Sequence, residues 1–283
     1  MSVPAGFGFA KLTQIGRSLA QGWVGIGEQA AFYVKSLVET GEVLAKYRLE
    51  LLRLVAQMSL GVGALALIGG AVMVVSFIVM NAGALVGIVG YSQLNDVGIE
   101  ALVGFFAAYV NPRLVAPLIT SVGLAATVGA GATAQIGAMR INEEIDALEV
   151  MGIRSIAYLV STRVLAGVIV VIPLFCLSAI LTNLASRAVV QYGYGQSVGV
   201  YDHYFKTFLQ PTDMIWAFLQ VLLQGTVIML VHTYYGYTAA GGPAGVGEAT
   251  GRAVRTSLIV ATMVTLIAGL ILYGRSGNFN LSG

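Results

Sequence analysis

The sequence predicts an all-α integral membrane protein with five transmembrane helices. Of its 283 residues, 57% are hydrophobic and 10% are charged, whereas about 25% are charged in an ordinary soluble domain. The charged residues are also clustered, and they leave five long uncharged stretches: 54–95, 114–139, 164–186, 214–247 and 256–274. Because a membrane-spanning helix needs about 20 predominantly apolar residues, each stretch accommodates one helix. We place these helices near 58–81, 114–137, 164–186, 214–236 and 256–274.

The five helices form a membrane domain over residues 56–275. Before it, residues 1–23 are expected to be a cytoplasmic segment, because they do not resemble a secretory signal peptide. After it, residues 276–283 are expected to be a periplasmic tail. Eleven of the 15 Lys and Arg residues lie in segments that are cytoplasmic if the N-terminus is inside. Since Lys and Arg favour cytoplasmic loops, this bias predicts an N-in, C-out orientation. We expect the protein to lie in the inner (plasma) membrane.

The segment 24–55 is too charged to cross a bilayer but has helical periodicity. At about 100° per residue, one side of such a helix carries its charges: Lys35, Glu39, Glu42, Lys46, Glu50 and Arg53. The opposite side is apolar: Tyr33, Leu37, Leu44, Leu51 and Val55. This pattern predicts an amphipathic helix that lies in the membrane interface. The alternative is a cytosolic helix packed on a partner subunit.

Composition and motifs exclude several classes of function. A net charge of +2 lacks the basic excess of a nucleic-acid-binding protein. A single cysteine allows neither an internal disulfide nor a cysteine-based zinc site. The chain has no G-x-x-x-x-G-K-[ST] or H-E-x-x-H motif. We therefore expect no catalytic residues, metal or cofactor, and we expect His232 to be a hydrogen-bonded packing residue more readily than a proton relay.

The most specific signal is the cytoplasmic loop over residues 140–152, between the second and third helices. Its apolar residues recur at helical spacing: Ile141, Ile145, Leu148 and Met151. Its acidic residues face elsewhere: Glu143, Glu144, Asp146 and Glu149. The pattern predicts a short amphipathic helix from Ile141 to Met151, with Leu148 at the centre of its apolar edge. Because acidic residues contribute little to topology, we interpret them as a docking surface for another protein; a solvated surface helix is the alternative.

This loop resembles the coupling region of the MlaE/YrbE family of ABC lipid-transport permeases, whose pattern is approximately G-x-M-x-x-x-E-Q-x-D-A-L-x-x-M-G. The matching residues here are Gly137, Met139, Glu143, Glu144, Asp146, Ala147, Leu148, Met151 and Gly152, with Glu144 in place of glutamine. Two further motifs match in order, over 158–166 and 236–254, although Thr162 replaces the proline of the first. The resemblance covers roughly residues 24–274.

The resemblance implies a half-permease whose partners are a cytoplasmic ABC ATPase dimer, docked on residues 140–152, and a second, non-identical YrbE-type permease. It is strongest to the Mce systems of the mycobacterial cell envelope, which implies periplasmic MCE-domain partners and import of fatty acids, mycolic acids or sterols. Two alternatives stay open. An ion-coupled secondary transporter normally carries acidic relays in its helices, and none of the predicted helices contains Asp or Glu. A non-transporting membrane scaffold is the other.

Two departures from the family pattern concern charge. Where the family often has R-E-L-G-P, this chain keeps Arg113 but has Leu114 in place of the acid. Where the family has A-E-[LI]-G, this chain has Gln135. The expected charge pairs are therefore missing or supplied by another subunit. Arg113, at the outer entrance of the second helix, is a candidate lipid-headgroup contact, with snorkelling to the interface as the competing explanation.

The outer segment 187–213 is rich in aromatic residues: Tyr192, Tyr194, Tyr201, Tyr204, Phe205 and Phe208. Aromatic side chains next to transmembrane helices form interfacial belts. The resemblance adds contact with MCE-domain proteins as a second role for this face.

Overall fold

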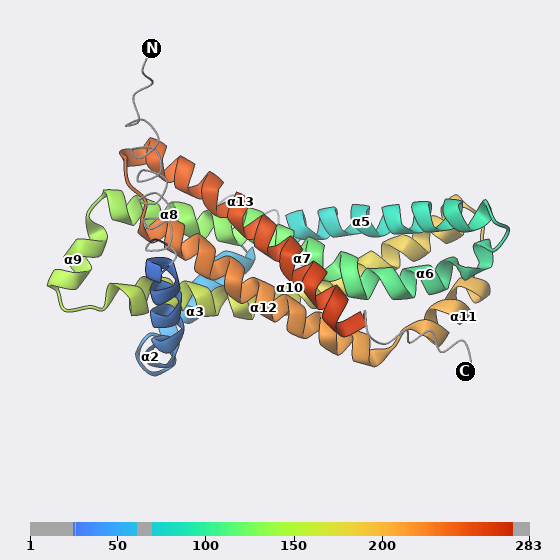
Figure 1. Cartoon of the computed structure of the whole chain (residues 1–283), viewed down its shortest axis with the longest axis horizontal. Helices are drawn as coiled ribbons and strands as arrows, with labels where there is room; N and C mark the ends of the chain where they lie inside the picture. Colours follow the sequence, from blue (N-terminus) through green and yellow to red (C-terminus); the bar gives the residue numbers. More distant parts are fainter. Residues whose placement is uncertain (1–24, 26, 61–69, 274–283) are drawn as a thin grey trace, which may run out of the picture.

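A computed structural model describes residues 25, 27–60 and 70–273, and within them every regular element is a helix (Figure 1). Five helical segments are long and apolar enough to cross a membrane: Gly70–Asn95, Glu100–Ile141, Ile156–Gly193, Pro211–Tyr237 and Gly242–Ile271. The prediction of an all-α protein with five membrane-spanning helices is therefore confirmed. The predicted end segments 1–23 and 276–283 lie outside the described residues.

The elements follow one another with short connections. Before the first span come the helical residues 27–38, then α2 (Thr40–Lys46) and α3 (Arg48–Leu60). The first span is α5 (Gly70–Asn95), and the second contains η1 (Glu100–Leu102), α6 (Val103–Val110), η2 (Asn111–Val115), α7 (Ala116–Leu124), η3 (Ala125–Gly129) and α8 (Ala130–Ile141). After α9 (Glu144–Val150), the third span contains η4 (Ile156–Ser161), α10 (Thr162–Ala188) and η5 (Val189–Gly193). The chain continues with α11 (Val198–Phe208), α12 (Pro211–Tyr237), α13 (Gly242–Ala268) and η6 (Gly269–Tyr273).

The first span differs from its prediction, because α5 begins at Gly70 rather than near residue 58. The uncharged stretch 54–95 is about twice as long as one membrane crossing requires, so hydropathy did not determine which half crosses. In the structure its beginning belongs to α3, and Gly70, with φ 52°, adopts a left-handed conformation that glycine tolerates at little cost. Residues 61–69, between α3 and α5, lie outside the described residues.

The second span is much longer than the predicted 114–137. Its 42 residues run from Glu100 to Ile141, and two π-helical turns, η2 and η3, interrupt it. The first of these turns contains Pro112, and Pro117 follows it closely. Since proline lacks a backbone N–H and disrupts regular α-helical hydrogen bonding, it accounts for the irregularity at η2.

The last span also begins earlier than the predicted residue 256. The glycine-rich segment before residue 256 is mostly helical, because α13 starts at Gly242 and contains Gly245 and Gly247. The turn is confined to residues 238–241, where Gly241 has φ 90°. Helices extend past the uncharged stretches because charged residues are compatible with a helix once it has left the hydrocarbon region.

The predicted single helix over 24–55 is divided into three helical pieces that bend at Glu39 and Tyr47. Val43 and Leu51 are buried and pack with Ala166 of α10. In contrast, Leu37 and Leu44 of the predicted apolar side are exposed. Part of the apolar side therefore packs on the rest of the protein, and part of it is exposed.

Close helix packing holds α5 against α10. A Cβ atom added to Gly83 would overlap the backbone of Thr182, and one added to Gly87 would lie 2.8 Å from the Ser186 carbonyl oxygen. The Ser186 hydroxyl also donates to the Gly83 carbonyl oxygen at 2.6 Å. Small residues let the two helix backbones approach closely, and the resulting van der Waals packing stabilises helix association in lipid.

At the end of the molecule opposite α9, α6 and α11 pack together (Figure 1). Tyr201 of α11 is buried with Val103, Ala107 and Val190, and Tyr194 stacks on a tyrosine of α5 with the ring centroids 4.2 Å apart. Part of the predicted aromatic belt is therefore a packed core, although Tyr192 remains highly exposed.

Candidate functional site

The predicted coupling helix lies at one end of the bundle, beyond the ends of α8, α10 and α12 (Figure 1). It is shorter than predicted. Ile141 is the last residue of α8, and α9 covers only Glu144–Val150. Glu143 lies between the two helices with φ 60°, the only positive φ of a described residue other than glycine. This left-handed residue ends α8 and redirects the chain into α9.

Gly152 ends α9. It has φ 75°, and the Ile153 N–H donates to the Leu148 carbonyl oxygen at 3.0 Å, as in a Schellman motif. The structure therefore explains this glycine as a helix terminator.

The inner side of α9 packs on its own chain. Ile145 is fully buried against Ile136 of α8 and Leu159 of η4, and Leu148 is half-buried in the same cluster. Ile145 of the predicted docking edge therefore contacts the bundle; the sequence could not distinguish an apolar residue that contacts the bundle from one that contacts a partner. Leu148 is thus not at the centre of a free edge.

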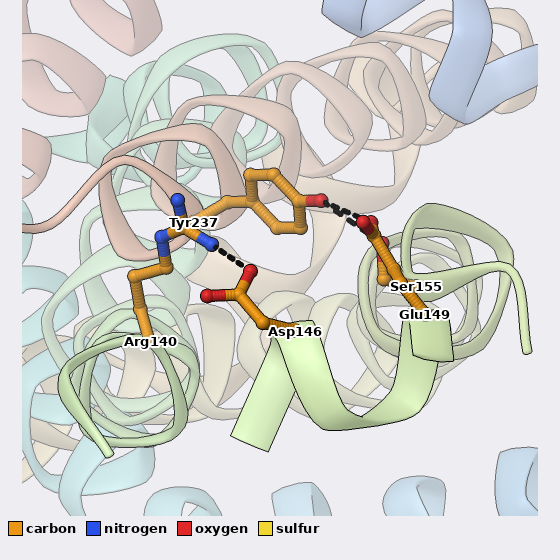
Figure 2. A network of polar contacts seen from close by, with 5 residues as sticks. All are labelled: Arg140, Asp146, Glu149, Ser155 and Tyr237. Carbon is orange, nitrogen blue, oxygen red and sulfur yellow. Dashed lines mark hydrogen bonds and ion pairs between the residues drawn. The ribbon is translucent and has the colours of Figure 1, made fainter. Parts of the chain in front are cut away.

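Three polar side chains tie α9 to two spans, as Figure 2 shows. Glu149 accepts a hydrogen bond from the Ser155 hydroxyl at 2.5 Å and one from the Tyr237 hydroxyl at 3.3 Å. The two hydroxyl oxygens lie 2.9 Å apart. Since Ser155 precedes η4 and Tyr237 ends α12, a displacement of α9 acts on the third and fourth spans together.

Arg140 and Asp146 close the turn between α8 and α9. The Arg140 Nη1 lies 2.8 Å from the Asp146 Oδ1. The guanidinium also lies 5.9 Å from the centroid of the Tyr237 ring. The pair is largely exposed, so it positions α9 more than it stabilises the fold.

The segment after α9 is tied to α2 by an ion pair of 2.9 Å between Arg154 and Glu42. Glu42 also accepts a hydrogen bond from Lys46 at 2.8 Å. The Lys46 hydrogen bond, followed by the Arg154 charge, holds the pKa of Glu42 below its usual value.

The outer side of α9 is exposed. Val150 is 89% exposed and Met151 66% exposed. The acidic residues Glu143, Glu144 and Asp146 are exposed as well. The helix therefore presents an apolar tip with acidic neighbours, a composition suited to a protein partner.

Arg113, the candidate lipid contact, has a partner within the chain. It lies in η2, where its Nη2 is 2.6 Å from the Asp213 Oδ2 and its guanidinium carbon is 3.8 Å from the centroid of the Tyr109 ring. Both charged side chains are about nine-tenths buried. Asp213, in the first turn of α12, thus supplies the acid that the sequence comparison found missing. The expectation that another subunit supplies it is not needed.

His232 is fully buried and bridges two helices. Its Nδ1 is 2.8 Å from the Thr133 hydroxyl and its Nε2 is 3.1 Å from the Ser257 hydroxyl. The prediction of a hydrogen-bonded packing residue is confirmed.

Sequence reasoning missed Ser155 and Tyr237 as site residues. Tyr237 is part of the 236–254 motif, so its position was visible, but its contact with Glu149, 88 residues away, was not.

The comparisons with known proteins agree with this architecture. Residues 62–277 match the family model described as Permease MlaE. The chain is 30% identical over 168 residues to the protein TRIGALACTOSYLDIACYLGLYCEROL 1, chloroplastic, of Arabidopsis thaliana, covering 59% of this chain and 48% of that one. It is 28% identical over 187 residues to a "Probable ABC transporter permease protein" of Rickettsia bellii, covering 66% and 72%. It is 28% identical over 182 residues to a "Probable ABC transporter permease protein" of Synechocystis, covering 64% and 69%.

The chain thus spans about half the length of the chloroplast relative and about 70% of the bacterial ones. The family model covers most of the chain, including all five spans and α9. The chain therefore belongs to the MlaE family of ABC transporter permeases.

Proposed function

We propose that this chain is the membrane subunit of a lipid transporter and that a separate cytoplasmic ATPase dimer drives it through α9. The observation that carries the proposal is that α9 packs on the bundle with one side and is exposed on the other. Its inner side is fixed to the third and fourth spans by Ile145 and Glu149, while Val150 and Met151 are exposed. Such a helix transmits the movement of a docked protein to the bundle.

The docking surface consists of Val150 and Met151, flanked by Glu143, Glu144 and Asp146. It replaces the edge centred on Leu148, whose side chain packs within the chain. A charge placed at Val150 falls in the joint, where an unpaired buried charge costs several kcal/mol. Each 1.4 kcal/mol changes affinity about tenfold.

The test is co-purification of the ATPase with Val150→Arg. Val97→Arg is the matched control, because Val97 is also exposed but lies beyond the C-terminal end of α5. We expect Val150→Arg to lose the ATPase and Val97→Arg to keep it. Retention of both the ATPase and lipid-stimulated hydrolysis by Val150→Arg would refute the assignment.

A second, non-identical YrbE-type permease is proposed to pack against α13. In the most apolar parts of α5 and α13, only 22% and 17% of the residues are buried. A two-fold assembly covers part of this surface and matches an ATPase dimer. If this chain expressed alone forms a stable homodimer that binds the ATPase, the two-permease arrangement is wrong.

We propose that the N-terminus is cytoplasmic and that the membrane is the plasma membrane. The Lys and Arg bias supports this orientation, and it places α9 on the ATPase side. Reporter fusions after residues 97 and 152 test it, because only the second is expected to report a cytoplasmic position.

The transported substrate is proposed to be a fatty acid, mycolic acid or sterol, delivered by MCE-domain proteins at the end formed by α6 and α11. An apolar groove of about 420 Å³ between α12 and α13 can hold a fatty acid, a sterol or part of a mycolic acid. It is lined by Trp216, Leu219, Leu223, Val264 and Ile267, with Gln220 as a polar residue. The chloroplast relative is named after a glycolipid. Mass spectrometry of lipid extracted from the purified complex tests the substrate, and recovery of only bulk membrane phospholipid would contradict it.

A further inference from the structure

Arg163 is a buried cation that no acidic side chain of this chain pairs with. It lies at the start of α10 and is 7% exposed. Its Nη1 donates to the Leu159 carbonyl oxygen at 3.0 Å, and its Nη2 lies 3.5 Å from the Gln135 Oε1. Its Nε has no hydrogen-bond partner. All 13 Asp and Glu residues lie in the described part of the chain, and none is within ion-pairing distance of Arg163.

The buried arginines Arg113 and Arg163 therefore differ in whether a carboxylate of the chain pairs with them. Arg113 is neutralised by Asp213. Arg163 faces Gln135, at the position where the family pattern has glutamate. The negative charge of the Glu50 carboxylate attracts Arg163 only from a longer distance. Glu50 forms its ion pair, of 3.8 Å, with Arg53. Because a buried charge without a close counter-ion is destabilising, an anion from outside the chain would stabilise Arg163.

Gln135 also lines a cavity of about 250 Å³ between α3, α5 and the second span. Its walls are mainly apolar, with Leu54, Met58, Val74 and Val128, and Gln57 adds a second amide. Gly131 lines the same cavity, and a Cβ atom added there meets nothing within 4 Å. One wall thus offers polar groups next to a cation, and the others suit a hydrocarbon chain.

We propose that Arg163 and Gln135 bind the anionic headgroup of a membrane lipid, a phosphate or a carboxylate, whose acyl chain lies along the cavity beside α5. Guanidinium groups form strong charge-assisted hydrogen bonds with both kinds of anion. This inference goes beyond the proposed function, because the site requires neither the ATPase nor transport.

The test is native mass spectrometry of the full-length protein, delipidated and titrated with phosphatidylglycerol or phosphatidylcholine of the same short acyl chains. The two lipids differ in net charge but share the apolar part. We expect the wild type to prefer phosphatidylglycerol by about tenfold, which corresponds to about 1.4 kcal/mol.

Gln135→Glu is the decisive variant, because it is nearly isosteric and supplies an internal counter-ion for Arg163. We expect it to abolish the preference for phosphatidylglycerol while the protein keeps or gains thermal stability. Gln93→Glu makes the same charge change at an exposed position near the C-terminal end of α5 and is expected to keep the preference. Gly131→Leu fills the cavity and is expected to weaken binding of both lipids.

Three outcomes overturn the proposal. The first is a wild type without preference between the two lipids. The second is a Gln135→Glu variant that keeps the preference. The third is loss of pairing with a second permease in Gln135→Glu without any change in lipid binding, which would assign the counter-ion to a partner's carboxylate. None of these outcomes depends on ATPase docking, so the two proposals fail separately.

Discussion

Removing the carboxylate of Asp213 is expected to destabilise the protein strongly, because it leaves the Arg113 guanidinium buried without its counter-ion. The side chains of Arg113 and Asp213 are 11% and 9% exposed. Breaking a buried ion pair at one partner costs about 3 to 5 kcal/mol. The Tyr109 ring still faces the guanidinium in the variant, and a cation–π contact contributes about 1 to 2 kcal/mol. We therefore expect Asp213→Ala to cost close to the lower value, about 3 kcal/mol.

The assay is thermal unfolding of the purified protein in detergent, followed by intrinsic fluorescence. At roughly 2 °C per kcal/mol for a chain of this size, Asp213→Ala lowers the melting temperature by about 6 °C. The control replaces both partners with apolar residues, Arg113→Met with Asp213→Leu, and is expected to remain within about 2 °C of the wild type. If Asp213→Ala melts like the wild type, the ion pair does not hold the charge of Arg113, and the lipid-contact interpretation regains its basis.

Three further predictions concern other contacts. Tyr237→Phe removes the hydroxyl that contacts Glu149, so we expect a stability loss of only about 0.5 to 1.5 kcal/mol but a clear loss of lipid-stimulated ATP hydrolysis in the complex with the ATPase. Gly83→Ala overlaps the backbone of α10 and should lower the melting temperature, whereas Gly251→Ala, whose Cβ meets nothing within 4 Å, should not. The pKa of Glu42 is lowered in the folded state, so its contribution is present above its usual pKa of 4.5 and is lost as the pH falls through the lowered value. The difference in melting temperature between wild type and Glu42→Gln at neutral pH should therefore shrink as the pH is lowered below 4.5.

The number of spans was predictable because it depends only on the lengths of uncharged stretches. The ends of the spans were not predictable, since a helix continues past the hydrocarbon region without changing its periodicity. Gly242 illustrates this point, because α13 begins there although hydropathy placed the span at residue 256. The first span was misplaced for the opposite reason, as the stretch 54–95 held more apolar residues than one crossing needs.

The candidate site was predictable in its pattern but not in its contacts. The periodicity of residues 141–151 correctly separated buried Ile145 from exposed Glu144 and Asp146. It could not show that Ile145 packs on its own chain. The partner of Arg113 lies 100 residues away in the sequence, and no local spacing rule connects two such positions.

The length of the second span has a consequence for how the protein sits in its bilayer. Forty-two helical residues extend about 63 Å, whereas a bilayer with its headgroups is about 40 to 45 Å thick. An untilted helix of this length extends roughly 20 Å beyond the headgroups, and tilt shortens the projecting part. The packing of α6 on α11 gives the α6 end of the span a core of its own. If this end projects from the bilayer, a protein that binds it contacts the bundle without touching the lipid headgroups.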